Sequence, residues 1–533
     1  MSNTKRLATL LPFAASALVA LPGCHIQSEA TQTTDVIGKN HPNVLFILID
    51  DIGYGDIGCH GNPFVKTPNI DKICSESFQF ENFTVSPCSA PTRAALMTGK
   101  QCFKSNVTHT IEGRSELDIN AETIADVMKS AGYVTGIFGK WHLGHSASRS
   151  PLRRGFDEML RVPDDNQISH YDPILNHNGK LTQYKGYRTD IIFKEATDFI
   201  VRNKNKQFFC YLPTYAAHAP HVVPQKYSDP YEGKDCNAKY YGMISNVDEN
   251  IGRLMAKLKE LGIDKNTLVI FMNDNGTTSP DTYNAGMRGR KGVSWYGGIR
   301  ASSFWRWPGV LPVEHCDQMT AHVDVFPTIA KIGGATIAPK TKADLEGISL
   351  VRYFKNPNAT DLDRIAIHHK GRWLPSANYA IHKYADVCVT YKDFTLVRMD
   401  RCHNPECSDC TMKDMKGRRD KPNAYGVTHF DTLPRGHWAL YNIKYHRAQM
   451  RDLSAFYPEI TKKLANEYEN WWKDVEHRLD VYSKDPEVQK GWHYADEHYG
   501  IKNINTLKKA ASKELKAELA KHKKALEAQK ENK

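Results

Sequence analysis

Oxygen-bearing side chains follow two widely separated apolar runs of this sequence. Asp50 and Asp51 come directly after NVLFILI, and Asp274 and Asn275 lie in NDNG, directly after TLVIFM. Three carboxylates packed together repel one another and raise one another's pKa values unless a cation neutralises them. Oxygen ligands favour Ca²⁺ or Mg²⁺ over Zn²⁺, and the looser geometry of Ca²⁺ makes one calcium ion the expected occupant. Asp50 and Asp51 alone would also fit a turn or a helix cap.

A candidate nucleophile lies in TVSPCSAPTRAALMTGK, where Cys88 and Ser89 are adjacent and neither has an obvious base beside it. Other segments carry side chains that can bind anions or transfer protons. Lys140 and His142 lie in GKWHLG, and His218 lies in HAP. These residues suit nucleophilic and acid–base chemistry if the fold brings them to Cys88 or Ser89.

The expected secondary structure places these residues at one edge of a sheet. Apolar runs at residues 43–49, 134–138, 208–212 and 267–272 alternate with helical stretches. This pattern predicts an α/β fold, with a mostly parallel sheet sandwiched by helices. The carboxyl ends of parallel strands form the binding edge of an open sheet, so the polar residues after these runs meet there. From about residue 365, shorter runs predict a smaller antiparallel sheet and then an amphipathic helix.

The segment SAPTRAALMTGK, residues 89–100, resembles the signature of type I, formylglycine-dependent sulfatases of the alkaline phosphatase superfamily. That signature is Cys or Ser, any residue, Pro, any residue, Arg, then an apolar pair and Thr-Gly. Pro91 and Arg93 set the frame, so Ser89 is the signature residue and Cys88 lies one place too early. GKWHLG, HAP, NDNG and RGRKGVSWYGGIR resemble further blocks in the family's order. The resemblance covers about residues 42–350 and implies an alkaline-phosphatase-like fold and a sulfuric ester hydrolase.

In this family the signature residue is oxidised to formylglycine (3-oxoalanine), and the resemblance implies the same change at Ser89. The hydrated aldehyde carries two hydroxyl groups on one carbon. One attacks sulfur and releases the alcohol, and loss of a proton from the other re-forms the carbonyl and expels sulfate. The ligands that the resemblance implies for calcium are Asp50, Asp51, Ser89, Asp274 and Asn275.

The resemblance also assigns roles to the basic side chains. Arg93 holds the formylglycine hydroxyl, and Lys140 and Lys291 bind the sulfate group. His142 accepts the proton of the second hydroxyl, and His218 protonates the leaving alcohol. The alternatives are a plain surface lysine for Lys291 and a packed interior histidine for His142.

Serine at position 89, where many relatives carry cysteine, implies a particular route of maturation. An oxygen-independent, radical-type formylglycine-generating enzyme would oxidise Ser89 in the cytoplasm, before export. Two further departures concern the substrate pocket. Arg290 replaces a common glycine, and Ala217 replaces a common proline before the histidine; neither change removes a ligand.

The amino terminus, MSNTKRLATLLPFAASALVALPGC, is typical of an export signal, with basic residues followed by a short apolar run. LPGC resembles a bacterial lipobox, which predicts a signal peptide at residues 1–23, lipidation of Cys24 and a polar tether at 24–40. We expect an exported bacterial lipoprotein, periplasmic or outer-membrane anchored through its lipid. Pro22 is unusual in a lipobox, so plain secretion is the alternative.

We expect a catalytic domain at residues 41–360, a C-terminal subdomain at 361–480 and a basic helical tail at 481–533. The formal net charge of +11 indicates anionic partners, and the sequence contains no motif that reads nucleic acid. CHNPECSDC, with Cys402, Cys407 and Cys410, fits disulfides better than zinc in an oxidising compartment.

The predicted function is hydrolysis of sulfate esters, with sulfated poly- or oligosaccharides as substrates. A phosphodiesterase or phosphonate hydrolase of the same superfamily is the second hypothesis. A non-catalytic, sulfoglycan-binding lipoprotein is the third, and an unmodified Ser89 would favour it. Candidate contacts to a sugar or a second sulfate, with a solvated basic strand end as the alternative, are His368, His369, Lys370, Arg372 and Trp373.

Overall fold

The computed structural model describes residues 37, 40–110, 114–163, 169–279, 282–360, 362–371, 379–400 and 433–483. The signal peptide, Cys24 and the three cysteines at 402, 407 and 410 lie outside this part of the chain. So do Arg372, Trp373 and residues 484–533 of the tail. Within the described residues, no helix is both long and apolar enough to cross a bilayer. The domain boundaries stay a prediction.

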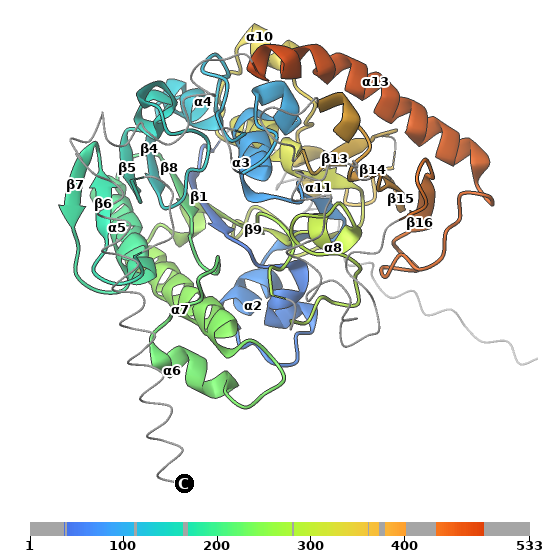
Figure 1. Ribbon diagram of the computed structural model, residues 1–533. Coiled ribbons are helices and arrows are strands. Elements are labelled where there is room, and N and C mark those ends of the chain that lie inside the picture. The colour runs from blue at the N-terminus through green and yellow to red at the C-terminus, as the bar shows by residue number, and fades with distance from the viewer. Residues whose placement is uncertain are drawn as a thin grey trace, which may run out of the picture.

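A ten-stranded sheet runs through the molecule (Figure 1). β1 pairs in parallel with both β8 and β9, and β4 pairs in parallel with β8 and β5. β10 is antiparallel to β9, and β6 and β7 add an antiparallel edge. In spatial order the strands are β11 (His315–Cys316), β2 (Phe78–Phe80), β10 (Ser303–Arg306), β9 (Thr267–Asn273), β1 (Asn43–Ile49), β8 (Phe208–Pro213), β4 (Val134–Phe138), β5 (Glu158–Arg161), β6 (Ile174–His177) and β7 (Lys180–Gln183).

Helices cover both faces of the sheet, which explains why β1 is apolar at every position. Val44, Phe46 and Leu48 face one core, and Leu45 and Ile47 face the other. The helices over the first face are α3 (Ser89–Thr98), α4 (Ile124–Ser130) and α9 (Val325–Ile332). Those over the second face, seen below the sheet in Figure 1, are α2 (Pro68–Ser75), α5 (Arg188–Asn203) and α7 (Ala238–Glu260). The predicted sandwich is confirmed.

A separate four-stranded antiparallel sheet forms the C-terminal part, as predicted. Its strands, in order, are β13 (Ala366–His369), β14 (Val387–Tyr391), β15 (Phe394–Arg398) and β16 (Ala439–Asn442). The amphipathic helix α13 (Pro458–Ser483) packs Leu464 and Trp472 into the same core as α3.

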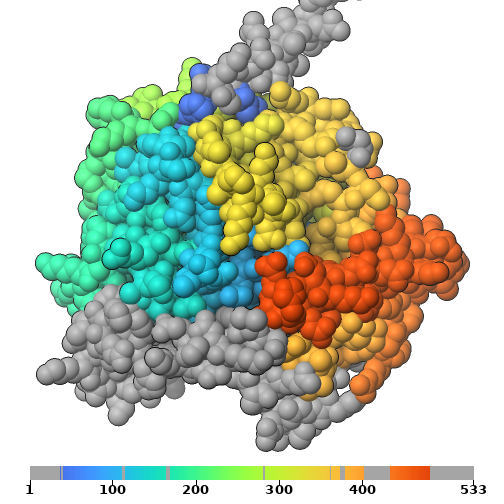
Figure 2. Space-filling model, turned by 90° about the horizontal axis from the view of Figure 1, so that it is seen from above, coloured from blue at the N-terminus to red at the C-terminus, as the bar shows by residue number. Residues whose placement is uncertain are grey.

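Charged side chains fasten α13 to earlier segments of the chain. Lys104 Nζ lies 2.5 Å from Asp474 Oδ2 of α13 and 3.2 Å from Glu346 Oε1. In Figure 2 the red helix lies beside the blue segment near residue 100 and the yellow segment before residue 350. The remaining α-helices and strands of the described residues are β3 (Phe83–Thr84), α6 (Gln225–Ser228), α8 (Tyr296–Ile299), β12 (Thr320–Ala321), α10 (Pro339–Ala343) and α11 (Val351–Lys355).

Candidate active site

The acidic residues that follow β1 and β9 meet, as the sequence predicts. Ile49 is in register with Asn273, so Asp50 and Asp51 emerge beside Asp274. One carboxylate oxygen of each of the three lies within 4.8 Å of the others, and all three side chains are buried. Asp51 has a φ of 61°, in the left-handed region that non-glycine residues rarely adopt. This turn lets consecutive aspartates face the same cluster.

Cations of the protein surround the three carboxylates. Lys140 Nζ donates to Asp50 Oδ2 at 2.8 Å, Arg93 donates to Asp274 Oδ2 at 2.9 Å, and Lys291 Nζ donates to Asp51 Oδ1. Burial raises the pKa of Asp50, but Lys140 and Arg93 outweigh it and hold that pKa below its ordinary value. The pKa of Asp51 is lowered in the same way, against burial, by Lys291.

Asp274 behaves differently, because burial and the neighbouring Asp50 raise its pKa and Arg93 only partly offsets them. This carboxylate therefore has the most to gain from an added cation. Asn275 offers a further oxygen ligand for a cation. Its Nδ2 donates a hydrogen bond to Asp51 Oδ1, whereas its buried Oδ1 has no hydrogen-bond partner among the described residues. A buried oxygen left without a donor costs free energy unless it coordinates a cation. The candidate ligand atoms are all oxygens, so the site fits Ca²⁺ and not Zn²⁺.

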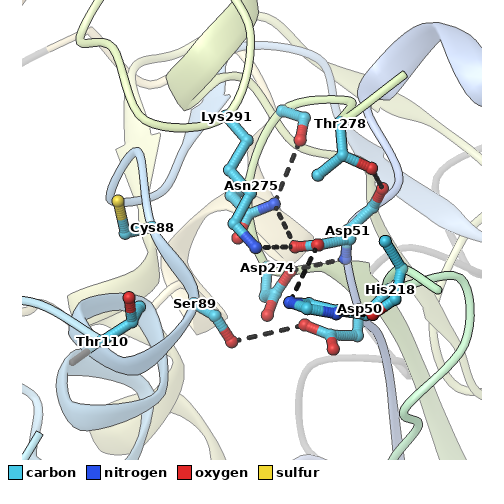
Figure 3. Close-up of polar contacts among 12 residues, drawn as sticks. Asp50, Asp51, Cys88, Ser89, Thr110, His218, Asp274, Asn275, Thr278 and Lys291 are labelled. Atoms are coloured by element: carbon cyan, nitrogen blue, oxygen red, sulfur yellow. Dashed lines mark hydrogen bonds and ion pairs between the residues drawn. The ribbon is translucent and has the colours of Figure 1, made fainter. Parts of the chain in front are cut away.

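Ser89 reaches this cluster from the first position of α3. Its Oγ donates to Asp50 Oδ1 at 3.3 Å and accepts from Arg93 Nε at 2.9 Å. Figure 3 shows the Ser89 hydroxyl directed at Asp50, while the Cys88 side chain points away from it. The Cys88 thiol instead lies 3.5 Å from His109 Nε2. Geometry thus agrees with the motif frame, in which Ser89 and not Cys88 belongs to the site.

Lys140 and His142 come from the turn that follows β4. Gly139 has a φ of 128°, and a Cβ there would lie 1.8 Å from the Pro213 carbonyl oxygen, so only glycine permits this close approach. His142 Nδ1 lies 3.5 Å from Ser89 Oγ, and its Nε2 lies 3.0 Å from the Thr110 carbonyl oxygen. A carbonyl only accepts hydrogen bonds, so Nε2 carries the proton and Nδ1 faces Ser89 as an acceptor.

His218 and Lys291 approach the cluster through Asp51. His218 Nε2 lies 3.5 Å from Asp51 Oδ2, and its Nδ1 lies 2.6 Å from the Ala219 carbonyl oxygen. Burial lowers the pKa of His218, and Asp51 opposes that shift. Burial also lowers the pKa of Lys291, but Asp51 and Asp50 outweigh it, so the net pKa rises and the ammonium group persists. The predicted metal ligands and catalytic side chains therefore meet at this edge of the sheet.

Comparison with known proteins identifies the family. The family model named Sulfatase matches residues 42–335. The chain belongs to the sulfatase family. It is 30% identical over 379 residues to human N-acetylgalactosamine-6-sulfatase, covering 64% of this chain and 71% of that relative.

Two solved structures share the fold of this sulfatase. Ps i-CgsB in complex with k-i-k-neocarrahexaose has a TM-score of 0.69 at 24% identity, covering 88% of this chain and 100% of that one. Phosphonate monoester hydrolase of Agrobacterium radiobacter has a TM-score of 0.56 at 17% identity, covering 81% of this chain and 96% of that one. The chain is thus a sulfuric ester hydrolase by family, on a fold that a phosphonate hydrolase also uses.

The sequence did not point to the residues that lie behind the three clustered aspartates of this sulfatase. The Tyr240 hydroxyl lies 2.9 Å from the Asp51 carbonyl oxygen and 2.6 Å from Asp56 Oδ2. Asp56 also accepts from Gly53 N at 2.8 Å, and burial raises the pKa of Asp56 to about 6. Tyr240 lies in a helix whose periodicity predicts a packed face, so only the fold reveals its contact with Asp51.

The suggested sugar contacts on β13 are wrong for His368 and His369. Each is 1% exposed in the sulfatase structure, so neither touches substrate and neither lies on a solvated strand end. The His369 ring packs 5.2 Å from Phe103 and 5.8 Å from Trp472. α13 encloses His369, whereas the His368 ring points to the opposite face of the strand and lies 5.9 Å from the His322 ring. The sequence reveals neither packing.

Proposed function

We propose that this sulfatase hydrolyses sulfate esters of poly- or oligosaccharides, using a formylglycine formed from Ser89 and a bound calcium ion. The observation that carries the proposal is the meeting of Ser89 with three buried carboxylates. The comparisons support the substrate class, because one relative is named for a sulfated amino sugar and one structural neighbour was solved in complex with k-i-k-neocarrahexaose. The net charge of +11 also suits an anionic glycan.

In the metal site, Asp50, Asp51, Asp274 and Asn275 would hold the ion together with the side chain at position 89. Bound calcium would supply positive charge that polarises the sulfate ester. The protein contributes further positive charge to bind the sulfate group, because the ammonium groups of Lys140 and Lys291 lie at the cluster. Residue 89 also begins a ten-residue helix, whose amino-terminal end favours an anion.

The first chemical step is transfer of the sulfuryl group to residue 89. One hydroxyl of the aldehyde hydrate gives its proton to Asp50, which already accepts a hydrogen bond from the residue 89 oxygen, and forms a bond to sulfur while the bond between sulfur and the sugar oxygen breaks. His218 gives its proton to that oxygen, so the sugar leaves as a neutral alcohol. Although burial lowers the pKa of His218, the negative charge of the sulfate group favours its protonated form.

The second step frees residue 89. The remaining hydroxyl gives its proton to His142, the carbonyl re-forms, and the carbon–oxygen bond to the sulfate breaks. His142 is suited to this role because Nδ1, the acceptor nitrogen, faces position 89 at 3.5 Å. Arg93 stays hydrogen-bonded to the residue 89 oxygen in both steps, and its positive charge balances the negative charge of Asp50 and Asp274. Water then adds to the aldehyde and restores the hydrate. Of the two protons left on Asp50 and His142, one returns to His218 and the other leaves to solvent, which completes the cycle.

An assay of matched variants tests this function. Protein produced together with a radical-type maturation enzyme is tested for sulfate release from N-acetylgalactosamine 6-sulfate and from sulfated oligosaccharides. We expect Ser89→Ala to abolish release and Cys88→Ala, one position away, to retain it. Cleavage of a phosphodiester or a phosphonate monoester without sulfate release would favour the second hypothesis. Glycan binding with no turnover and an unmodified Ser89 would favour the non-catalytic one.

We also propose that oxidation of Ser89 precedes export and that lipidated Cys24 anchors the mature protein to a membrane. The support is the serine at the signature position and the LPGC sequence at residues 21–24. Inhibition of lipoprotein signal peptidase in the native host should leave residues 1–23 attached. Correct cleavage elsewhere, with an unmodified Cys24, would show plain secretion instead.

A further inference from the structure

Two cysteines lie together just beyond the metal-binding aspartates. Cys59 lies in a short 3₁₀ turn (Gly58–His60), and Cys74 lies in the last turn of α2 (Pro68–Ser75). The two thiols are in contact, and this contact is the chief cause that raises the pKa of the Cys59 thiol, with burial and the neighbouring Asp71 adding to it. Cys59 is exposed, whereas Cys74 is buried. A reagent from solution can therefore reach Cys59, and Cys74 is the neighbouring thiol that can react next.

The approach of the two thiols is fixed by the backbone around them. Cys59 N donates to Asp71 Oδ1 at 2.8 Å, and Gly58 N donates to Thr67 Oγ1 at 2.7 Å. Thr67 in turn donates to Asp71 Oδ1 at 2.9 Å. Asp71 and Cys74 are three residues apart on α2, so they share a helix face. The same face that holds the Cys59 backbone therefore presents the Cys74 thiol.

Other described cysteines have different neighbours. The Cys236 thiol donates to the Tyr231 carbonyl oxygen, and the Cys316 thiol donates to the Pro357 carbonyl oxygen. In both contacts the thiol is bonded to a backbone oxygen and not to a second sulfur. Cys236 thus provides a natural control for the behaviour of a lone, half-buried thiol in this protein.

We propose that Cys59 and Cys74 form a disulfide bond when the protein meets a disulfide oxidant. The Cys59 thiolate attacks one sulfur of an oxidant such as glutathione disulfide, forms a mixed disulfide and releases one glutathione thiolate. The Cys74 thiolate then attacks the Cys59 sulfur and releases the second glutathione. The two cysteines lose two electrons and two protons in total, and glutathione disulfide gains them as two thiols.

The cross-link would fasten the segment after Asp50 and Asp51 to α2. It replaces the contact between the two thiols and breaks the hydrogen bond from the Cys74 thiol to Gln79 Oε1 at 3.3 Å, while Gln79 Nε2 keeps its bond to the Cys74 carbonyl oxygen. A disulfide that closes a short loop stabilises mainly by restricting the unfolded chain. For a protein of this size we expect Tm to rise by about 3 °C.

Peptide mass spectrometry of the full chain tests the proposal directly. The protein is incubated with glutathione disulfide or with reduced glutathione, alkylated, and digested with trypsin and a glutamyl endopeptidase. Cleavage after Glu76 separates Cys74 from Cys88, which otherwise share one tryptic peptide. We expect the oxidised sample to contain the Cys59 and Cys74 peptides joined, with two hydrogens fewer than the two separate thiol peptides.

The variants sharpen the result. Cys236→Ser should leave the joined peptides unchanged, whereas Cys59→Ser should leave Cys74 open to alkylation after unfolding and remove the oxidant-dependent rise in Tm. The proposal is overturned if the oxidised protein carries separate glutathione adducts or alkylated thiols at positions 59 and 74. A link from either residue to Cys88 would overturn it as well.

Discussion

The contact between Tyr240 and the Asp51 backbone leads to the sharpest prediction about the metal site. Tyr240→Phe removes one hydroxyl that lies 2.9 Å from the Asp51 carbonyl oxygen and 2.6 Å from Asp56 Oδ2. Residues that orient metal ligands typically contribute 10–100-fold to affinity. Thr278 Oγ1 remains 3.4 Å from the same carbonyl oxygen, so the lower end applies. We expect Ca²⁺ affinity to fall about 10-fold, which corresponds to about 1.4 kcal/mol.

The neighbouring residue on the same helix offers a matched control. The Tyr241 hydroxyl accepts from Asn62 Nδ2 and from Tyr283 N, and no bond joins it to Asp51. Isothermal titration of metal-free protein with Ca²⁺ should therefore show a loss for Tyr240→Phe and little change for Tyr241→Phe. Circular dichroism checks that both variants fold. Equal affinities in the two variants, or an unchanged affinity in Tyr240→Phe, would refute the reasoning.

Three further predictions concern the ion, the second step and pH. Asn275→Ala should abolish turnover and Ca²⁺ binding with the fold retained, as circular dichroism would show; normal Ca²⁺ binding would contradict it. His142→Ala should trap sulfate on residue 89, which peptide mass spectrometry detects; faster accumulation of free sulfate would count against this role. Burial lowers the pKa of His368 from 6.5 to about 3, so the unfolded chain gains the proton first and stability falls as pH drops below 6.5. Between pH 7 and pH 4.5, the Tm should fall less for His368→Asn than for the unaltered protein, as thermal unfolding would show. An equal fall in Tm for both would argue that His368 does not cause this pH dependence.

Much of the fold could be predicted because parallel strands buried on both faces must be apolar throughout. The runs at 43–49 and 134–138 match β1 and β4, and those at 208–212 and 267–272 fall one residue short of β8 and β9. The acidic cluster followed from the same reasoning, since polar residues that end neighbouring parallel strands must meet. Ser89, Arg93 and Lys291 came instead from the resemblance to the sulfatase motifs.

Other features depend on packing between distant segments, which spacing along the chain does not encode. Tyr240 meets Asp51 only because α7 crosses the end of β1. His369 is enclosed because α13 returns over β13, and its charge alone suggested exposure. The Cys59–Cys74 contact likewise depends on how a loop folds back on α2.

The extent of oxidation at residue 89 tests the central claim most directly. Samples produced with increasing amounts of a radical-type maturation enzyme are assayed for sulfate release, and the aldehyde at position 89 is quantified in the same samples by peptide mass spectrometry. The account predicts that activity rises in proportion to the aldehyde and extrapolates to zero where residue 89 is fully serine. Full activity from protein with an intact serine would contradict it.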